Sequence, residues 1–303
     1  MSMISEAVRE IRTNWAIRDA KRDEGLATPE DIRRYDDISY GPYGKWNLLD
    51  IYQRKDAKGA GPVIVNVHGG AWVYGNKEIY QFYCMNLAQR GFTVVSFNYR
   101  LAPEVGYPAP LEDTNAVMTF IKEHAEEYQL DPENVFVVGD SAGAQIASQY
   151  LTIYSNPEYA AFFDFRVPDV KIRAAALNCG LYDVKKAIEV GLEERIEDYV
   201  GEERYQEPMG KGTVLESLDV TGNMTKDFVP SFVMSAVNDF LVDHAEPMYR
   251  YLKALGTDCE FRIYGSKEQE EVAHVFHVNI KLEEAKKCND DECAFFRRHM
   301  SER

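Results

Sequence analysis

The feature that most constrains the fold is a strand-like run at residues 135–138. It ends at once in Gly139-Asp140-Ser141-Ala142-Gly143 and continues as a helix-forming segment of small side chains. A strand packed against the following helix needs small residues where the two backbones approach, which gives the glycines an architectural explanation. A second interpretation is a nucleophile elbow, in which a serine on a tight strand-to-helix turn exposes its hydroxyl. The motif alone leaves both interpretations open.

The remainder of the chain has a regular alternation of element types. From residue 48 onward, short runs of β-forming residues alternate with helix-length amphipathic segments, which predicts an α/β protein with a mostly parallel central sheet and helices on both faces. The Asp131-Pro132 pair predicts a turn just before the strand that leads to Ser141. We predict strands at residues 48–52, 63–67, 93–99, 135–138, 172–178, 231–237 and 260–264, and helices at 77–90, 110–128, 142–155, 243–255 and 275–299.

Two segments fall outside this alternation. Residues 1 to about 35 predict one helix and part of a second, with Thr28 as the N-cap and Pro29 at the first helical position. Residues 183–228 form a charged stretch that is longer than an ordinary crossover. Because the chain has no long polar linker or internal repeat, we expect a single domain over residues 1–303. Both segments would contribute to a small helical cap over the carboxyl edge of the sheet.

Composition narrows the partners and the location. The net charge of -16 argues against nucleic acid, because phosphates would be repelled. The N-terminal segment lacks the apolar core of a signal peptide and no apolar run could span a membrane, so we expect a cytoplasmic protein without a membrane partner. Homo-oligomerisation stays open.

The five cysteines are scattered and odd in number, which fits reduced thiols rather than a disulfide framework. Cys288 and Cys293 bracket four polar residues, but neither a clustered histidine nor a second cysteine pair lies nearby. We therefore expect no metal site.

A second glycine turn follows another predicted strand, where residues 63–67 run into His68-Gly69-Gly70-Ala71-Trp72. Two glycines let successive backbone N–H groups turn toward a common point, which suits the negatively charged oxygen of a tetrahedral intermediate. We expect the donors to be the amides of Gly69, Gly70 and Ala142, the last being the residue after the serine. His68 precedes the nucleophile in the chain, and we expect it to brace this loop. The alternative is a glycine turn without function.

A serine nucleophile needs a base, and the base needs a carboxylate that orients it. With a nucleophile elbow the expected chain order is serine, carboxylate, histidine, each after a strand. The predicted strand at 231–237 leads to Asp239, and the one at 260–264 leads to a loop with His274. Alone, each residue has an ordinary explanation as a helix cap or a solvated loop residue, and we interpret Asp243 as such an N-cap. The ordered trio favours catalysis.

Together these segments resemble the hormone-sensitive lipase-like branch of the α/β-hydrolases. The resemblance implies the α/β-hydrolase fold, with Ser141 as nucleophile, Asp239 as orienting carboxylate, His274 as base and the glycines of HGGA as oxyanion donors. Two positions depart from the family pattern without removing a catalytic group: Ala71, where a third glycine is frequent, and Val275, where HGF is frequent. The matching segments cover nearly all of the chain after residue 60: HGGAW (68–72), YRLAPE (99–104) with Pro108-Ala109 and Asp113, GDSAG (139–143), DFLVD (239–243) and HVF (274–276).

These observations predict a serine carboxylesterase that hydrolyses short-chain acyl esters of small molecules through an acyl-enzyme, with no metal or organic cofactor. The segment LDIY at 49–52 resembles bacterial esterases of acylated carbohydrates and the related formamidases. A formamide or amide hydrolase on the same triad is therefore an alternative. A third hypothesis is a ligand-binding receptor, because plant gibberellin receptors resemble this family, but they lack the catalytic histidine that is present here as His274. His277 is close enough to be mistaken for the base, and we place it in the first turn of the helix at 275–299.

Overall fold

The computed structural model describes residues 4–183, 191–209, 212–218 and 220–301. Its centre is an eight-stranded sheet in the order β1-β2-β4-β3-β5-β6-β9-β10. Strand β2 is antiparallel to both of its neighbours, and the strands from β4 to β10 pair in parallel. The strand bounds are β1 Ile32–Ser39, β2 Leu48–Arg54, β3 Gly61–Val67, β4 Thr93–Phe97, β5 Leu130–Asp140, β6 Ile172–Asn178, β9 Ser231–Ala236 and β10 Cys259–Tyr264.

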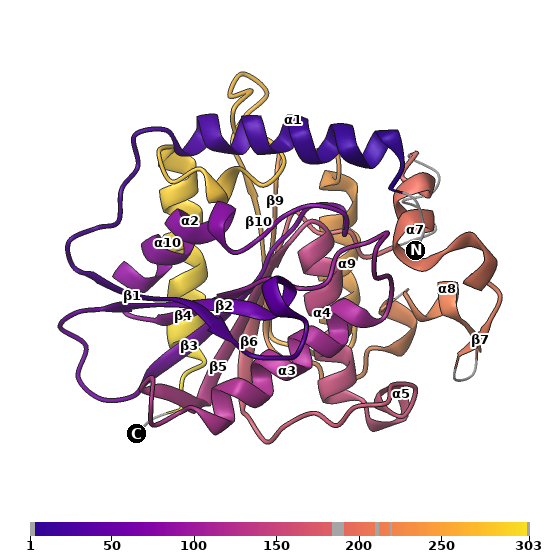
Figure 1. The fold of residues 1–303 in the computed structure, drawn as a ribbon, viewed down its shortest axis with the longest axis horizontal. Helices are drawn as coiled ribbons and strands as arrows, with labels where there is room; N and C mark the ends of the chain where they lie inside the picture. Colours follow the sequence, from indigo (N-terminus) through magenta and orange to yellow (C-terminus); the bar gives the residue numbers. More distant parts are fainter. Residues whose placement is uncertain (1–3, 184–190, 210–211, 219, 302–303) are drawn as a thin grey trace.

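Helices cover both faces of this sheet (Figure 1). Along β5, Val135 and Val137 face one apolar cluster, while Phe136 and Val138 face the other, because successive side chains of a strand point to opposite faces. The first cluster includes residues of α3, α4 and α9, and the second includes residues of α2 and α10. These helices are α2 Gln81–Gln89, α3 Ala109–Glu123, α4 Ala142–Ser155, α9 Val242–Ala254 and α10 Glu283–Arg298.

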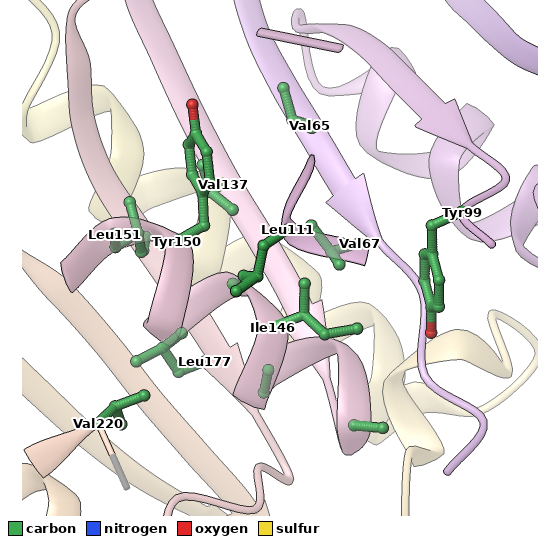
Figure 2. Packing of buried hydrophobic residues seen from close by; sticks show 14 of the residues in the cluster. Val65, Val67, Tyr99, Leu111, Val137, Ile146, Tyr150, Leu151, Leu177 and Val220 are labelled. Carbon is green, nitrogen blue, oxygen red and sulfur yellow. The ribbon is translucent and has the colours of Figure 1, made fainter. Parts of the chain in front are cut away.

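Figure 2 shows part of the buried apolar packing between α4 and the central strands. Val65 and Val137 are register partners on the neighbouring strands β3 and β5, and both are fully buried. Ile146 and Leu151 belong to α4 and lie in the same apolar cluster as these two valines (Figure 2). The helix that follows Ser141 is therefore fixed to the two central strands by side chains without exposed surface.

Peripheral elements lie at the ends and flanks of the sheet. Helix α1 (Glu6–Asp23) runs across one end of the molecule, and its N-terminal part lies near α7 (Figure 1). The others are α5 Pro157–Ala160, α7 Glu193–Val200, α8 Val214–Ser217, the two-stranded pair β7 Pro208–Met209 and β8 Gly212–Thr213, and the short 3₁₀ helices η1 Gly44–Asn47, η2 Glu78–Tyr80, η3 Glu202–Arg204, η4 Thr221–Asn223 and η5 Phe276–Val278.

The predicted second N-terminal helix is wrong. Thr28 and Pro29 precede a strand, β1, which pairs antiparallel with β2 over most of its length. This pairing satisfies the backbone groups of residues 32–39 and buries Ile32, so it outweighs the local helix-start signal. The predicted turn at Asp131-Pro132 lies within β5 rather than before it, because β5 begins at Leu130. The strand is irregular there: its register with β3 shifts between Asp131 and Val135, and the Glu133 amide donates to Asp131 Oδ1 at 3.1 Å.

Two helix starts differ from the prediction as well. The C-terminal helix begins at Glu283 rather than near Val275, and residues 276–278 form η5 instead. Val275 has a left-handed backbone (φ 55°), which an α-helix cannot contain. Asp243 is not an N-cap, because α9 already begins at Val242 and Asp243 lies in its first turn.

Two further findings concern the whole described chain. Within the described ranges, no helix combines the length and the apolar character that crossing a bilayer requires. The five cysteines are all buried and free.

Candidate active site

Ser141 lies at the junction between β5 and α4, with φ 53° and ψ −122°. Its amide donates to the carbonyl of Asn178 at the end of β6, with 3.0 Å between nitrogen and oxygen. The flanking glycines are needed for close approach: a Cβ on Gly139 would lie 2.5 Å from the Gly143 carbonyl oxygen, and one on Gly143 would lie 2.1 Å from that of Val67. The glycines are thus architectural, and the turn they permit projects the serine beyond the sheet.

The structure brings Ser141, His274 and Asp239 together from three separate strand ends. His274 Nε2 lies 2.9 Å from Ser141 Oγ, and His274 Nδ1 lies 2.7 Å from Asp239 Oδ1. A proton on Nδ1 that is donated to Asp239 leaves the Nε2 lone pair facing the serine hydroxyl. The geometry is that of a nucleophile, a base and an orienting carboxylate.

Asp239 is held by more than the histidine. Its carboxylate also accepts from Ser235 Oγ at 2.7 Å and from the Leu241 amide at 2.9 Å. Burial opposes its ionisation, but the hydrogen bonds and charge interaction with His274, together with these two donors, hold the pKa of Asp239 below its ordinary value. Asp239 therefore stays ionised and keeps His274 oriented. Ser235 was missed in the sequence because a serine within an apolar strand carries no signal of its partner.

Two residues near the base have an unusual backbone conformation, one in the His274 loop and one in the HGGAW loop. Val275 takes a left-handed φ of 55°, and Ala71 in the HGGAW loop takes φ 51°. These are the two positions where the chain departs from the glycines frequent in the resembling family, so both substitutions carry backbone strain. Phe240, a largely exposed ring, lies 4.4 Å from the His274 ring, centroid to centroid, and covers one side of the base.

The three expected oxyanion donors differ in whether the amide hydrogen is already bonded within the protein. The Gly69 amide already donates to the Tyr80 hydroxyl at 3.0 Å, so its hydrogen is engaged. Among the described residues, the amides of Gly70 and Ala142 have no protein acceptor within hydrogen-bonding distance, and both residues line the cavity beside Ser141. The geometry thus favours Gly70 and Ala142 as donors. The hydrogen bond from the Gly69 amide to Tyr80 had no local sequence signal.

His68 is buried inside the same loop. Its Nδ1 lies 2.8 Å from the Gly69 carbonyl oxygen, and its ring stacks on Tyr99 with 4.1 Å between centroids. Burial lowers the pKa of His68 to about 4, so the ring is neutral near pH 7. These contacts fit the expected bracing role and keep His68 away from the reacting atoms.

A cavity of about 490 Å³ opens in front of Ser141 and His274. Its walls come from the HGGAW loop, the serine turn, the Asp239 and His274 loops, helix α1 and the region of α7. Helix α1 contributes Ile11, Trp15 and Arg18, none of which carried a catalytic signal in the sequence. No residue of the LDIY segment lines this cavity, because those residues are buried in β2.

Helix α1 is attached by apolar contacts, such as those of the buried Val8, and by polar contacts. Arg12 donates to both carboxylate oxygens of Glu104 at 2.7 Å and to the carbonyls of Val73 and Ala102. Farther along the helix, Asp19 accepts from the Tyr74 hydroxyl at 2.8 Å. The helix is thereby fixed to the HGGAW loop and to the YRLAPE segment.

One cluster in the described part of the chain has the chemistry of metal ligands. It consists of Cys179, Asp239 and His274, whose ligand atoms all lie within 4.8 Å of one another. Burial raises the pKa of the Cys179 thiol well above its ordinary value, and Asp239 and His274 are already hydrogen-bonded to each other. The set is therefore the triad with a neutral thiol beside it. Cys288 and Cys293 are buried on α10.

His277 is not beside Ser141. It is buried in η5, its ring contacts Tyr83 edge-on at 5.1 Å between centroids, and its Nδ1 has no partner among the described residues. Burial lowers the pKa of His277 to about 3, which keeps it neutral. Of the two histidines, only His274 reaches the serine.

Comparisons with known proteins fit this geometry. Residues 49–248 match the model of the BD-FAE family. The probable carboxylic ester hydrolase LipM of Mycobacterium tuberculosis is 32% identical over 212 residues, which are 68% of this chain and 48% of LipM. Esterase LipQ of the same organism is 31% identical over 241 residues, 75% of this chain and 56% of LipQ. The chain thus spans about half the length of the curated relatives it matches.

The fold is also found among solved structures. Esterase B from Lactobacillus rhamnosis, in a form inhibited by a tributyrin phosphonate, aligns with a TM-score of 0.87 at 21% identity, over 98% of this chain and 97% of the esterase. The chain therefore belongs to the BD-FAE family, and its fold is the α/β-hydrolase fold.

Proposed function

We propose that this protein is a serine carboxylesterase for short-chain acyl esters. The observation that carries the proposal is the continuous hydrogen-bond chain from Asp239 through His274 to Ser141, which ends at a cavity of about 490 Å³. Two backbone amides, those of Gly70 and Ala142, line the same cavity and have no protein acceptor among the described residues. Nucleophile, base, carboxylate and oxyanion donors are the complete set that acyl transfer needs.

The reaction divides into two halves. In the first, Ser141 Oγ attacks the ester carbonyl while His274 Nε2 takes the hydroxyl proton, and the amides of Gly70 and Ala142 stabilise the negative oxygen. Collapse of the intermediate breaks the bond to the alcohol, which leaves with the proton from His274. In the second half, His274 takes a proton from water, the hydroxide attacks the acyl-enzyme, and the proton returns to Ser141. Asp239 stays ionised and stabilises the imidazolium in both halves.

The proposed substrate class rests on the relatives and on the cavity. LipM and LipQ are named as ester hydrolases, and Esterase B is inhibited by an analogue of a butyryl ester. The formamide alternative drew its support from LDIY, but those residues are buried in β2 and do not contact the cavity. The receptor alternative requires loss of the base, whereas His274 lies at bonding distance from Ser141. A cytoplasmic location remains a prediction, supported by the five unpaired cysteines.

Replacing Ser141 by alanine tests the proposal. We expect Ser141→Ala to lower kcat for 4-nitrophenyl butyrate by a factor on the order of 10⁶ without loss of the fold, because the hydroxyl contributes nothing to core packing. The matched control is Ser155→Ala at the end of the same helix α4, where the hydroxyl donates to the Leu151 carbonyl at 2.8 Å, and full activity is expected. A purified, folded Ser141→Ala protein that kept more than a few per cent of activity would place the nucleophile elsewhere.

The same assay separates ester from formamide chemistry. Wild-type protein is given 4-nitrophenyl acetate, an acetylated sugar and an N-formyl aromatic amide at equal concentrations. The proposal requires kcat/KM for an ester to exceed that for the formamide. The reverse order would support the formamidase alternative on the same triad.

A further inference from the structure

We propose that Tyr80, held by the Asp140 carboxylate, is a positioning residue that fixes the oxyanion loop relative to Ser141. This inference rests on the proposed function, since it assigns how one part of that site is kept in place. Tyr80 is the last residue of η2, which follows the HGGAW loop, and its side chain is 5% exposed. It lines the cavity together with Gly69 and Asp140. Its hydroxyl is hydrogen-bonded to these two residues rather than to Ser141 or His274, so it is neither the nucleophile nor the base.

The first step is the direction of the hydrogen bonds. Tyr80 Oη lies 2.7 Å from Asp140 Oδ2 and 3.0 Å from the Gly69 amide nitrogen. A carboxylate only accepts and an amide only donates, so the hydroxyl gives its proton to Asp140 and accepts the Gly69 hydrogen with a lone pair. The three groups form one directed chain, Gly69 N–H to Tyr80 O–H to Asp140.

The second step is the state of the carboxyl. Asp140 is buried, and burial raises its pKa to about 6 while the Tyr80 hydrogen bond opposes that rise. Near pH 8 the group is therefore ionised. A hydrogen bond to an ionised acceptor is shorter and roughly twice as strong as a neutral one. Tyr80 is thus held firmly at its oxygen, and it in turn holds the Gly69 amide.

The third step is what the chain connects. Asp140 is covalently bonded to Ser141, and Gly69 is covalently bonded to Gly70, one of the two favoured oxyanion donors. The two segments are also in close contact, because a Cβ on Gly69 would lie 2.7 Å from Asp140 Oδ2. Tyr80 therefore sets the separation between the attacking oxygen and the Gly70 amide. A donor shifted by even a fraction of an ångström stabilises the developing charge less well.

The start of η2 is also held in place. Lys77, immediately before η2, forms an ion pair with Asp50 of β2 at 2.9 Å, and both side chains are 2% exposed. The Ile79 amide donates to Asn76 Oδ1 at 2.9 Å. Tyr80 is consequently fixed both at its hydroxyl and at the backbone of η2, which a positioning role requires.

The experiment compares two buried tyrosines. Tyr80→Phe keeps the ring and removes the hydroxyl, and we expect kcat for 4-nitrophenyl butyrate to fall by about 10- to 100-fold while KM changes less than about twofold. Affinity for a trifluoromethyl ketone, which forms a stable adduct that mimics the charged intermediate, is expected to fall by the same factor as kcat/KM. Asp140→Asn, which keeps a neutral acceptor for Tyr80, is expected to lose less than Asp140→Ala.

The matched control is Tyr83→Phe. Tyr83 is also buried, lies near Tyr80, and donates to a buried carboxyl, Glu292, at 3.2 Å, but its hydroxyl has no contact with the oxyanion loop. We expect this variant to keep kcat within about threefold of wild type. Its melting temperature is expected to change by about as much as that of Tyr80→Phe.

Two results would overturn the inference: a Tyr80→Phe protein that keeps more than half of kcat and of ketone affinity, or equal losses in Tyr80→Phe and Tyr83→Phe, which would indicate only general destabilisation. Activity remaining in Ser141→Ala would count against the proposed function instead, so the two failures are distinguishable.

Discussion

His274 and His277 are separated by two residues, yet they lie in different environments. His274 is hydrogen-bonded between Asp239 and Ser141, whereas His277 faces the apolar cluster around Tyr83 on the other face of the sheet. The left-handed turn at Val275 separates them. Spacing alone does not distinguish the two, because the predicted helix would have placed them only about 60° apart around its axis.

We predict opposite consequences for the two histidines. His274→Ala is expected to remove nearly all turnover, because Ser141 then lacks its base. His277→Ala is expected to keep kcat within about tenfold and to lower stability by roughly 2 to 4 kcal/mol, because a buried ring is replaced by a void. Steady-state kinetics and thermal unfolding of both variants check this. An inactive His277→Ala beside an active His274→Ala would make the base assignment wrong.

At the scale of single residues, the candidate catalytic groups could be predicted from the sequence, whereas the residues that hold them in place could not. Ser141, Asp239 and His274 follow strands in the required order, which the sequence displays directly. The engagement of the Gly69 amide depends on Tyr80, eleven residues later, and on Asp140, from another strand. Such a contact exists only once β3 and β5 are neighbours in space.

Among the elements, α10 carries an unexpected group on its buried face. Glu292 is fully buried; it accepts from Asn178 Nδ2 at 2.8 Å and from the Tyr83 hydroxyl at 3.2 Å. Burial raises its pKa from 4.5 to about 7, and the nearby charges of Asp140 and Arg90 act in opposite directions. Through Asn178, whose carbonyl accepts the Ser141 amide, α10 also contacts the serine turn.

This carboxyl makes stability depend on pH with a definite sign. Its pKa is higher in the folded than in the unfolded chain, so its contribution to stability is fully present below about pH 4.5 and is lost as pH rises through about 7. Glu292→Gln cannot ionise. The free energy of unfolding of Glu292→Gln minus that of wild type is therefore expected to be about 2 kcal/mol larger at pH 8 than at pH 5.

Urea unfolding of both proteins at the two pH values measures this difference. The control is Glu283→Gln on the exposed side of the same helix, for which we expect little change with pH. A Glu292→Gln effect that was equal at pH 5 and pH 8 would show that this carboxyl does not titrate in the range.

Element prediction succeeded where one pattern dominated and failed where two competed. The strand at 172–178 and the helix at 142–155 match the structure to the residue, because β-branched or small apolar runs are bounded by clear turns. At Thr28-Pro29 a local helix signal competed with pairing to β2, and the pairing prevailed. Near Val275 the packing of η5 delayed the helix start by two turns.

For the whole molecule, charge and surface point to soluble substrates. In the described ranges the exposed large apolar side chains are Ile17, Tyr43, Phe240 and Ile263, which lie in four separate segments of the chain. The net charge of -16 disfavours anionic interfaces. A lipid-surface enzyme would instead expose a contiguous apolar face.

We therefore predict that acyl length governs activity. Acetyl to butyryl 4-nitrophenyl esters are expected to give kcat/KM at least about tenfold above that of the palmitoyl ester, because a dissolved short chain enters the cavity without an interface. Initial rates below the solubility limit of each ester supply the comparison. A clear rise from butyryl to palmitoyl would contradict the prediction.

The close approach of the two glycine turns has a consequence for how the sequence can evolve. Gly143 admits nothing larger because of Val67, and Gly69 admits nothing larger because of Asp140. A side chain at either glycine would therefore force the backbone of the facing segment to move, so the two turns constrain each other's sequence. Helix α1, attached by side-chain contacts such as Arg12 to Glu104, has no such constraint. Divergence toward new substrates is expected to accumulate in α1, while the two turns pass unchanged from ancestor to descendant.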